Sequence, residues 1–346
     1  MKVPRGERQR SQHQGTRRRG TERAPRGSRS TPTEAELIGV LTREFASVDG
    51  AAHVALGIGD DAACVRFSGN LVVSVDGQIE GTHFRREWLG LDDVGYRSFQ
   101  AAISDLAAMG ASPVAAVAHL TLPERFSTAE LRRLTRGQAE AAQATSCPVV
   151  GGNLSRGPEL TVVTTVLGKA TRCLSRSGAR PGDELWLLGE VGLARAGLEL
   201  LSASTPVRSV ATRRAVSAWR RPRALLDAGR GLVGKAHACL DVSDGLARDA
   251  RNLAVASGVR VEIHAEALGA ALSIDLGKAA RTLGVSPLWL ACEGGEDYAL
   301  LAAGPSRRRP AEAKVIGAVR AGDGAHWVEA GGSKPLTGGF DHFSGQ

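Results

Sequence analysis

Apolar residues recur along the chain at two spacings, and each spacing predicts a different kind of element. Helical spacing predicts one helix that begins near residues 33–36. It predicts further helices over residues 92–109, 128–145, 193–201, 213–219 and 246–256. Short apolar runs predict strands over residues 64–67, 71–75, 114–120, 161–166, 184–188, 238–242, 259–264 and 298–302. Strands and helices therefore mix throughout, which predicts an α+β (mixed α/β) fold.

Two changes in composition divide the chain into three parts. Residues 1–33 contain almost no apolar side chains, so this segment cannot bury enough surface to offset its ordering entropy, and we expect it to be a disordered tail. The turn-forming residues 177–183 begin a second half. We therefore expect a tail over residues 1–33, one domain over 34–170 and another over 171–346.

The positive charge is concentrated in that tail. The chain of 346 residues carries a formal net charge of +8, and the ten basic and two acidic side chains of residues 1–33 account for all of it. The remainder is electrically balanced, and only 4% of the residues are aromatic. Both observations argue against a nucleic-acid partner, except through the tail.

The cysteines and the hydropathy pattern predict a cytoplasmic protein. Five cysteines occur without a C-x-x-C pair, which is typical of reduced thiols in a cytoplasmic chain. No run of about 18 apolar residues is present, so no membrane span is expected. The arginine-rich N-terminus lacks the apolar region of a secretory signal.

Acidic clusters beside glycines or at strand ends are the main chemical signal. They are G-I-G-D-D at 57–61, S-V-D-G at 74–77, I-S-D-L at 103–106, D-V-S-D-G at 241–245 and G-G-E-D at 294–297. Any one of them alone is more often a turn or a helix cap, as Asp244 would be for the helix near residue 246. Five together favour a site that binds divalent cations, and oxygen ligands favour Mg²⁺ over Zn²⁺.

A further segment imitates a phosphate-binding loop. Residues 229–236 read G-R-G-L-V-G-K-A, close to G-x-x-x-x-G-K-[ST]. Ala236 replaces the hydroxyl residue that holds Mg²⁺, and the preceding residues 223–228 have a helical pattern. We therefore expect nucleotide to bind elsewhere.

Longer motifs extend these clusters into a family resemblance. They are G-I-G-D-D-A-A from Gly57, E-G-T-H-F from Glu80, I-S-D-L-A-A-M-G from Ile103, V-V-G-G-N-L-S-R-G from Val149, S-R-S-G-A-R-P-G-D from Ser175, D-V-S-D-G-L from Asp241, G-G-E-D-Y from Gly294 and G-F-D-H-F from Gly339. In this order they resemble the thiamine-monophosphate kinase family over residues 34–343. The G-G-E-D-Y and terminal D-H-F elements distinguish this family from others that share its fold.

The resemblance implies a fold, a reaction and an assembly. The fold is the two-domain fold of the aminoimidazole-ribonucleotide-synthetase superfamily, with N-terminal domains that pair into a dimeric β-barrel. The reaction is direct in-line transfer of the ATP γ-phosphoryl group to thiamine monophosphate on a cluster of Mg²⁺ ions, with no covalent enzyme intermediate. Residues 34–170 would bind ATP and Mg²⁺ and form the homodimer, and residues 171–346 would complete the nucleotide and substrate site.

The resemblance also assigns roles to individual positions. The implied metal ligands are Asp61, Ser74, Val75 (through its carbonyl), Asp76, Asp105, Asn153, Asp241 and Asp244. The implied ATP contacts are Gly152, Asn153, Arg176 and Ser243, and the implied substrate contacts are His83, Glu296 and Phe340. Phe340 would stack on a thiamine ring, and Glu296 would pair with its cationic or amino groups.

Two positions depart from the family pattern. The family usually has Asp at the position of Asn153 and Thr at that of Val75. Asparagine keeps an oxygen ligand but loses a unit of charge, so one metal ion should bind more weakly. Val75 can still offer its carbonyl.

Two other kinds of function remain open. One is another ATP-using enzyme of the same fold, such as a selenophosphate synthetase or a purine-pathway cyclo-ligase, although residues 1–60 lack the reactive cysteine that the former requires. The other is a non-catalytic nucleotide-binding paralogue, or a nucleic-acid-associated protein that uses the arginine-rich tail.

Overall fold

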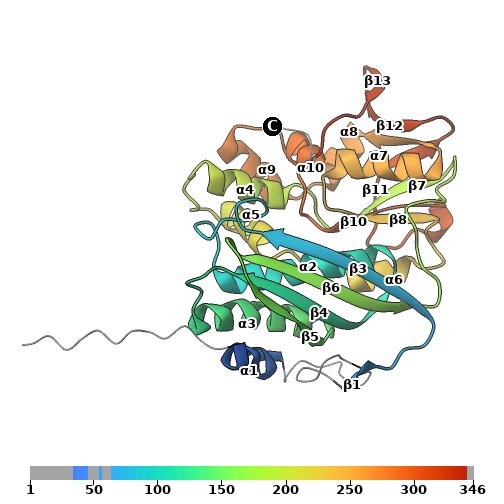
Figure 1. Cartoon of the computed structure of the whole chain (residues 1–346). Helices are drawn as coiled ribbons and strands as arrows, with labels where there is room; N and C mark the ends of the chain where they lie inside the picture. The colour runs from blue at the N-terminus through green and yellow to red at the C-terminus, as the bar shows by residue number, and fades with distance from the viewer. Residues whose placement is uncertain (1–33, 46–53, 57–63, 341–346) are drawn as a thin grey trace, which may run out of the picture. The chain divides into compact units, whose positions relative to one another are not determined.

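The first half of the chain contains a four-stranded sheet with one face covered by helices (Figure 1). The computed structural model describes residues 34–45, 54–56 and 64–340. The strand order is β3-β6-β4-β5, and only β4 and β5 are parallel neighbours. The strands are β3 (Asn70–Ile79), β4 (Ser112–Leu122), β5 (Val149–Arg156) and β6 (Thr161–Ala170).

Two long helices, α2 (Leu91–Ala108) and α3 (Thr128–Thr145), cover this sheet, and α1 (Glu34–Phe45) packs beside α3. Glycines allow α2 and α3 to approach closely. A Cβ atom at Gly95 would lie 1.9 Å from the carbonyl oxygen of Leu134, and one at Gly137 would lie 1.8 Å from that of Asp92. Both contacts would be with backbone atoms, so the close packing of the two helices requires residues without a side chain at these two positions.

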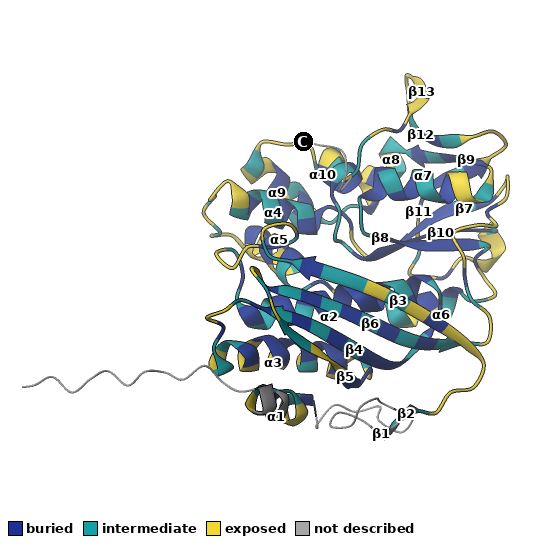
Figure 2. Cartoon of the chain, in the orientation of Figure 1, coloured by how far each residue is buried: buried dark blue, intermediate teal, exposed yellow. Residues whose placement is uncertain are grey.

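The opposite face of the four-stranded sheet is more open. Leu71, Val73 and Val75 of β3 are 52%, 55% and 61% exposed, and β3 carries exposed stretches in Figure 2. A short hairpin of β1 (Val54–Leu56) and β2 (Cys64–Val65) contributes Val54 and Val65 to an apolar cluster on this sheet.

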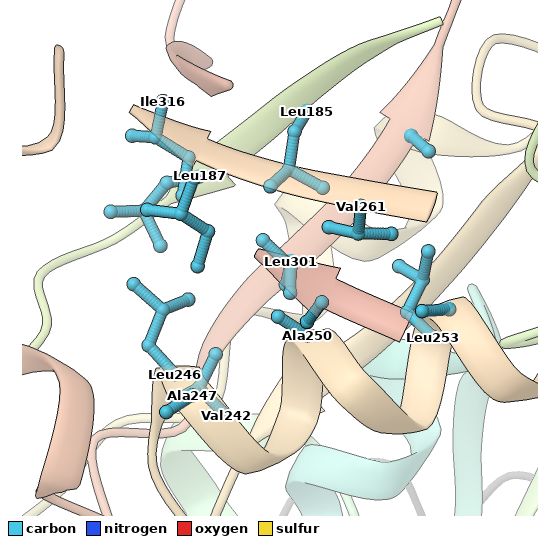
Figure 3. Close-up of a cluster of buried hydrophobic side chains, with 14 of the residues drawn as sticks. Leu185, Leu187, Val242, Leu246, Ala247, Ala250, Leu253, Val261, Leu301 and Ile316 are labelled. Carbon is cyan, nitrogen blue, oxygen red and sulfur yellow. The ribbon is translucent and has the colours of Figure 1, made fainter. Parts of the chain in front are cut away.

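The second half contains a seven-stranded sheet with the order β13-β12-β9-β11-β7-β10-β8. Two helices, α7 (Leu246–Ser257) and α8 (Ala265–Ala271), pack on one face of it, where Leu246, Ala250 and Leu253 contact the strands (Figure 3). The strands are β7 (Glu184–Leu188), β8 (Ala238–Val242), β9 (Arg260–His264), β10 (Ala299–Gly304), β11 (Lys314–Arg320), β12 (Gly324–Glu329) and β13 (Gly332–Pro335).

Helix α2 belongs to the cores of both sheets. Ile103 and Leu106 pack with the four-stranded sheet, while Ala107 packs with Trp186 and Leu300 of the seven-stranded sheet. The helix α6 (Leu226–Leu232) lies against α2, and a Cβ atom at Gly229 would be 1.9 Å from the Ala107 carbonyl oxygen. The G-R-G-L-V-G-K-A segment therefore includes a packed helix, and the prediction that it is not a phosphate-binding loop agrees with this.

Four further helices form an apolar cluster beside the sheets. They are α4 (Leu193–Ser202), α5 (Val210–Arg220), α9 (Ile274–Leu283) and α10 (Pro287–Glu293). A short 3-10 helix, η2 (Ser306–Arg308), follows β10.

The mixed α/β fold is confirmed, and within the described residues neither sheet closes into a barrel. None of the described helices combines the length and the apolar character that a bilayer crossing requires. Among the cysteines whose side chains the structure describes, four are free: Cys147, Cys239 and Cys292 are buried and Cys173 is half-buried. The predicted tail, residues 1–33, lies outside the described residues, and the domain boundaries stay predictions.

Candidate functional site

Residues from both halves of the chain line a cavity of about 550 Å³. Its walls come from β3 and residues 81–88, from α2 and α4, and from the segments that follow β8 and α10. Most of the predicted site residues line it: Val75, Asp76, His83, Asp105, Asp241, Ser243, Asp244, Glu296 and Phe340. Four of the five predicted acidic clusters, far apart in the sequence, thus meet in one place, and the fifth, residues 57–61, lies outside the described residues.

Serine hydroxyls bond to two of the carboxylates that line this cavity, although neither serine lines it. Ser74 of β3 donates a hydrogen bond to Asp105 of α2. Ser104 of α2 donates to Asp241 of β8, with 2.7 Å between Ser104 Oγ and Asp241 Oδ2. Asp105 and Asp241 are therefore each held by a serine from a different element.

Burial and mutual repulsion disfavour the charged forms of these carboxylates. Burial, and then the charge of Asp105, raises the pKa of Asp76 to about 6 and that of Asp241 to about 7. Burial also raises the pKa of Asp105, while the hydrogen bond from Ser74 and the positive charge of Arg176 lower it. A bound cation would relieve this repulsion.

The donor set fits Mg²⁺, with a restriction on how the ion is held. Among the described residues, no three His, Cys, Asp or Glu side chains come close enough together to hold one ion. Mg²⁺ in proteins commonly takes one or two carboxylates and completes its coordination with substrate phosphates and water. Because no three of the described carboxylates lie together, coordination by one or two of them at a time suits this cavity. Asp61, another predicted ligand, lies outside the described residues.

A buried acid that the sequence did not single out contacts one of the residues that line the cavity. Asp249 of α7 accepts a hydrogen bond from the backbone nitrogen of Asp244 at 3.2 Å. Burial, and then the charge of Asp241, raises its pKa to about 7. Its signal in the sequence was an acid in the first turn of a predicted helix, which is common at helix starts and therefore not diagnostic.

Glu296 is already hydrogen-bonded through both of its oxygens. Arg97, which is fully buried in α2, donates to Oε1, and Trp219 Nε1 of α5 donates to Oε2 at 2.7 Å. The guanidinium of Arg97 also lies 4.7 Å from the centre of the Trp219 ring. Glu296 lines the cavity, so its carboxylate is oriented before any ligand binds.

The other two predicted substrate contacts lie at the cavity wall. His83 Nδ1 accepts a hydrogen bond from the backbone nitrogen of Ile79 at 3.2 Å, which fixes the ring at the end of β3. Phe340 is 47% exposed, and its backbone nitrogen donates to the Asp244 carbonyl at 2.9 Å.

Asn153 and Gly152 do not line the cavity. They lie on β5, at the edge of the sheet away from β3, and Asn153 pairs in register with His119. Asn153 Nδ2 is 3.0 Å from His119 Nδ1, on the open face of the sheet. Arg176 does not line the cavity either, although its charge acts on both Asp105 and Asp241.

The cavity also has lining residues that sequence reasoning missed. Trp88 and Arg85 follow the E-G-T-H-F motif, and their proximity to it was the available signal. Arg195 and Glu199 project from α4 and form an ion pair of 2.7 Å. An i, i+4 pair on a helix is usually a solvated surface pair, so nothing in the sequence marked these two.

Comparisons with known proteins first define the class. The family model described as "AIR synthase related protein, N-terminal domain" matches residues 59–170. A solved structure of the hydrogenase maturation protein HypE with ATP has the same fold, with a TM-score of 0.71 and 20% identity over 91% of this chain and 97% of that one. The chain thus shares the overall fold of that protein, and residues 59–170 are similar to the N-terminal domain of the AIR-synthase-related proteins.

More similar relatives then identify the family. The thiamine-monophosphate kinase of Aquifex aeolicus is 35% identical over 289 residues, which are 83% of this chain and 92% of the relative. That of Mycobacterium tuberculosis (strain H37Rv) is 36% identical over 288 residues, 80% and 84% of the two chains. A solved complex of AaThiL with AMPPCP and TMP has a TM-score of 0.75 and 30% identity, covering 91% of this chain and 100% of that one. The chain belongs to the thiamine-monophosphate kinase family.

Proposed function

We propose that this protein transfers the γ-phosphoryl group of ATP to the phosphate of thiamine monophosphate, releasing thiamine diphosphate and ADP. The observation that carries the proposal is the cavity in which Asp76, Asp105 and Asp241 converge from three elements beside the aromatic residue Phe340. Family membership and the related complex that holds AMPPCP and TMP support it.

The chemistry explains why carboxylates dominate a site for two anionic reactants. An attacking phosphate oxygen must approach a phosphoryl group of the same charge, so catalysis depends on positioning and charge neutralisation. Bound Mg²⁺ would supply the positive charge. The proposed ligands remain Asp61, Ser74, Val75, Asp76, Asp105, Asn153, Asp241 and Asp244.

The remaining residues bind and orient the reactants. Arg176 and the backbone at Gly152 and Ser243 contact the nucleotide, since a guanidinium offers paired donors to phosphate. The organic part of thiamine monophosphate occupies the side of the cavity lined by His83 and Phe340. Glu296, oriented by Arg97 and Trp219, keeps lone pairs with which to accept from the substrate's amino group.

The proposal includes a homodimer formed through the open face of the four-stranded sheet. Leu71, Val73 and Val75 leave a row of large apolar side chains exposed on β3, which favours burial against a second copy. Gly152 and Asn153 lie on the same sheet, so a nucleotide bound along this face would contact them. Pairing of two such sheets would form the β-barrel of the family.

A coupled ADP-release assay with ATP, Mg²⁺ and thiamine monophosphate tests the function. We expect turnover by the wild-type protein, and Asp76→Ala should lower kcat by at least about a hundredfold because a metal-binding carboxylate is lost. Asp227→Ala, at a side chain 90% exposed on α6, is the matched control and should retain full activity.

The outcomes also separate the alternatives. Turnover only with a different acceptor would indicate another enzyme of the same fold. Nucleotide binding without ADP release at millimolar Mg²⁺, for every acceptor tried, would replace the kinase assignment with that of a non-catalytic paralogue.

A further inference from the structure

One wall of the cavity is formed by a single face of α4. Four residues of this helix line the cavity: Arg195, Leu198, Glu199 and Ser202. They follow one another at helical spacing, which places them on one side of α4. The segment that follows α10 packs against the base of Arg195, since a Cβ atom at Gly294 would lie 2.5 Å from Arg195 Cβ. This wall therefore borders the same cavity as the proposed metal-binding carboxylates.

Three contacts limit the positions that the Arg195 side chain can take. Its base packs against Gly294, and its guanidinium lies 5.4 Å from the centre of the Trp289 ring. Its Nε donates a hydrogen bond to Glu199 Oε1 at 2.7 Å, and the side chain is only 28% exposed. The guanidinium is therefore oriented before a ligand binds, which lowers the entropy cost of holding that ligand.

The terminal nitrogens of this guanidinium, Nη1 and Nη2, form no hydrogen bond with the described residues. The ion pair with Glu199 uses Nε, so the N–H groups of Nη1 and Nη2 remain available, and their planar arrangement suits phosphate oxygens. Helix stability does not explain an arginine here. Arg195 lies in the first turn of α4, where the helix dipole already places positive charge. The arrangement favours a site for an anionic group.

Arg195 is also the better placed of the two arginines that line the cavity. The described lining residues include Arg85 and Arg195 and no lysine. Arg85 lies in a segment of turns, its side chain is 57% exposed, and its ion pair with Glu87 is 3.6 Å long. Among these lining residues, Arg195 alone combines a fixed side chain with unpaired terminal nitrogens.

The neighbours of Arg195 place it on the side of the acceptor and not of the nucleotide. Gly294, at the base of Arg195, belongs to the G-G-E-D segment, and Glu296 of the same segment lines the cavity as a proposed contact of the acceptor. By contrast, Gly152 and Arg176, two of the proposed nucleotide contacts, do not line the cavity. A phosphate held by Arg195 is therefore that of the acceptor.

We propose that Arg195 binds the phosphate of thiamine monophosphate and so selects a phosphorylated acceptor. The inference rests on the proposed function, in which this phosphate approaches ATP inside the cavity. Two phosphate groups repel each other, and a fixed cation on the α4 wall lowers that repulsion together with the metal ions held by the carboxylates. Removal of Arg195 weakens binding of the phosphorylated compound and leaves binding of the unphosphorylated one unchanged.

Calorimetry with thiamine monophosphate and with thiamine, which lacks the phosphate, tests the proposal. In Arg195→Ala we expect Kd for thiamine monophosphate to rise about tenfold or more, the effect of losing a charge-assisted contact. Kd for thiamine and Kd for ATP should each stay within about twofold of the wild-type value. Arg320→Ala, at a 57% exposed arginine that also pairs with a glutamate, is the matched control and should bind as the wild type does.

Glu199→Gln separates a direct contact from a structural effect. Glutamine keeps an oxygen that can accept from Arg195 Nε, and it removes the negative charge that offsets the guanidinium. Kd for thiamine monophosphate should therefore fall, by about twofold or more. A rise in Kd in both variants would show that Arg195 acts only as the structural partner of Glu199, and the proposal would be wrong.

Three other results would overturn the proposal. They are an equal loss of affinity for thiamine and thiamine monophosphate in Arg195→Ala, a loss for ATP in their place, and an unchanged Kd for thiamine monophosphate. The first would indicate a general distortion of the cavity, because the absent phosphate cannot matter for thiamine. The second would assign Arg195 to the nucleotide.

A turnover assay on the same samples keeps the two proposals distinct. Wild-type protein that binds thiamine monophosphate without turnover, with Kd raised for this compound alone in Arg195→Ala, would refute the kinase function and support the phosphate contact. Wild-type protein that turns over with an unchanged Kd in the variant would do the reverse. Absence of both binding and turnover would refute both.

Discussion

At the residue scale, His119 determines how Asn153 presents its amide. An amide nitrogen can only donate, so His119 Nδ1, 3.0 Å from Asn153 Nδ2, must accept. The ring proton then lies on Nε2, which is 3.1 Å from Thr121 Oγ1 and can donate to it. This arrangement leaves Asn153 Oδ1 as the atom that can serve a cation or a nucleotide.

Metal affinity should therefore increase when Asn153 is replaced by aspartate, the residue that the family resemblance implies at this position. Asn153→Asp adds a negative charge at the proposed metal and nucleotide site. We expect the Mg²⁺ concentration for half-maximal activity to fall about threefold or more, with a parallel increase in Mn²⁺ affinity measured by paramagnetic resonance. Asn153→Ala should shift both in the opposite direction. If neither variant changes either quantity, Asn153 is not a ligand.

Site residues could be predicted where a short motif around the residue already indicates its chemistry. Asp76 precedes a glycine, Asp105 follows a serine and Asp241 lies two residues before a serine, each in a short motif, and the structure brings the three to one cavity. The partners of Glu296 could not be predicted. Arg97 is 199 positions away, and its total burial depends on how two halves of the chain pack.

At the element scale, the contact between α2 and α3 depends on two glycines. Replacing one of them with alanine has two opposing effects on stability, one from helix propensity and one from steric overlap. Alanine is favoured over glycine in a helix by about 1 kcal/mol. A Cβ atom at Gly137, however, would meet the Asp92 carbonyl oxygen at 1.8 Å, and overpacking costs about 1–3 kcal/mol or more when backbone must move. The steric effect should dominate.

Gly137→Ala should accordingly lower the free energy of unfolding by about 2 kcal/mol, measured by urea denaturation. Gly277→Ala in α9 is the matched control, because only the flexible Arg281 side chain, at 3.9 Å, lies near its Cβ position. That variant should be stabilised by about 0.5–1 kcal/mol. Equal effects in the two variants would show that helix propensity, and not packing, decides both.

The elements with local signals were predicted well, and those without them were missed. The helix at residues 128–145 has the predicted bounds because a capping box of Ser127 and Glu130 marks its start. The edge strand β5 was missed, since its Gly151, Gly152 and Asn153 have low strand propensity and form a strand only through pairing with β4. The helices α8 and α10, each of seven residues, are too short to show a period.

At the scale of the whole molecule, the exposed row on β3 decides whether two copies associate. Val73→Asp places a charge in the middle of that row, where a dimer would have to bury it without a partner. We expect a shift from dimer to monomer in light scattering coupled to size exclusion, with at least a tenfold weaker dimer. Folding should be unaffected because Val73 is 55% exposed.

The control for this change is Val255→Asp on α7, where the side chain is 77% exposed and distant from β3 in sequence. It should leave the assembly unchanged. A wild-type protein that is monomeric at assay concentration, or a Val73→Asp variant that stays dimeric, would exclude this face as the interface.

The position of α2 between the two sheets has one more consequence. Its buried polar side chains bind three separate segments of the second half: Arg97 bonds to Trp219 and Glu296, Gln100 to the Ala224 nitrogen at 2.9 Å, and Ser104 to Asp241 at 2.7 Å. Rotation of one half of the chain relative to the other would break these hydrogen bonds. The buried groups would then lack a partner, at a cost of roughly 1–3 kcal/mol for each bond. Catalysis should therefore proceed without hinge closure, and the two halves of the chain should keep the same relative orientation while substrates bind and products leave.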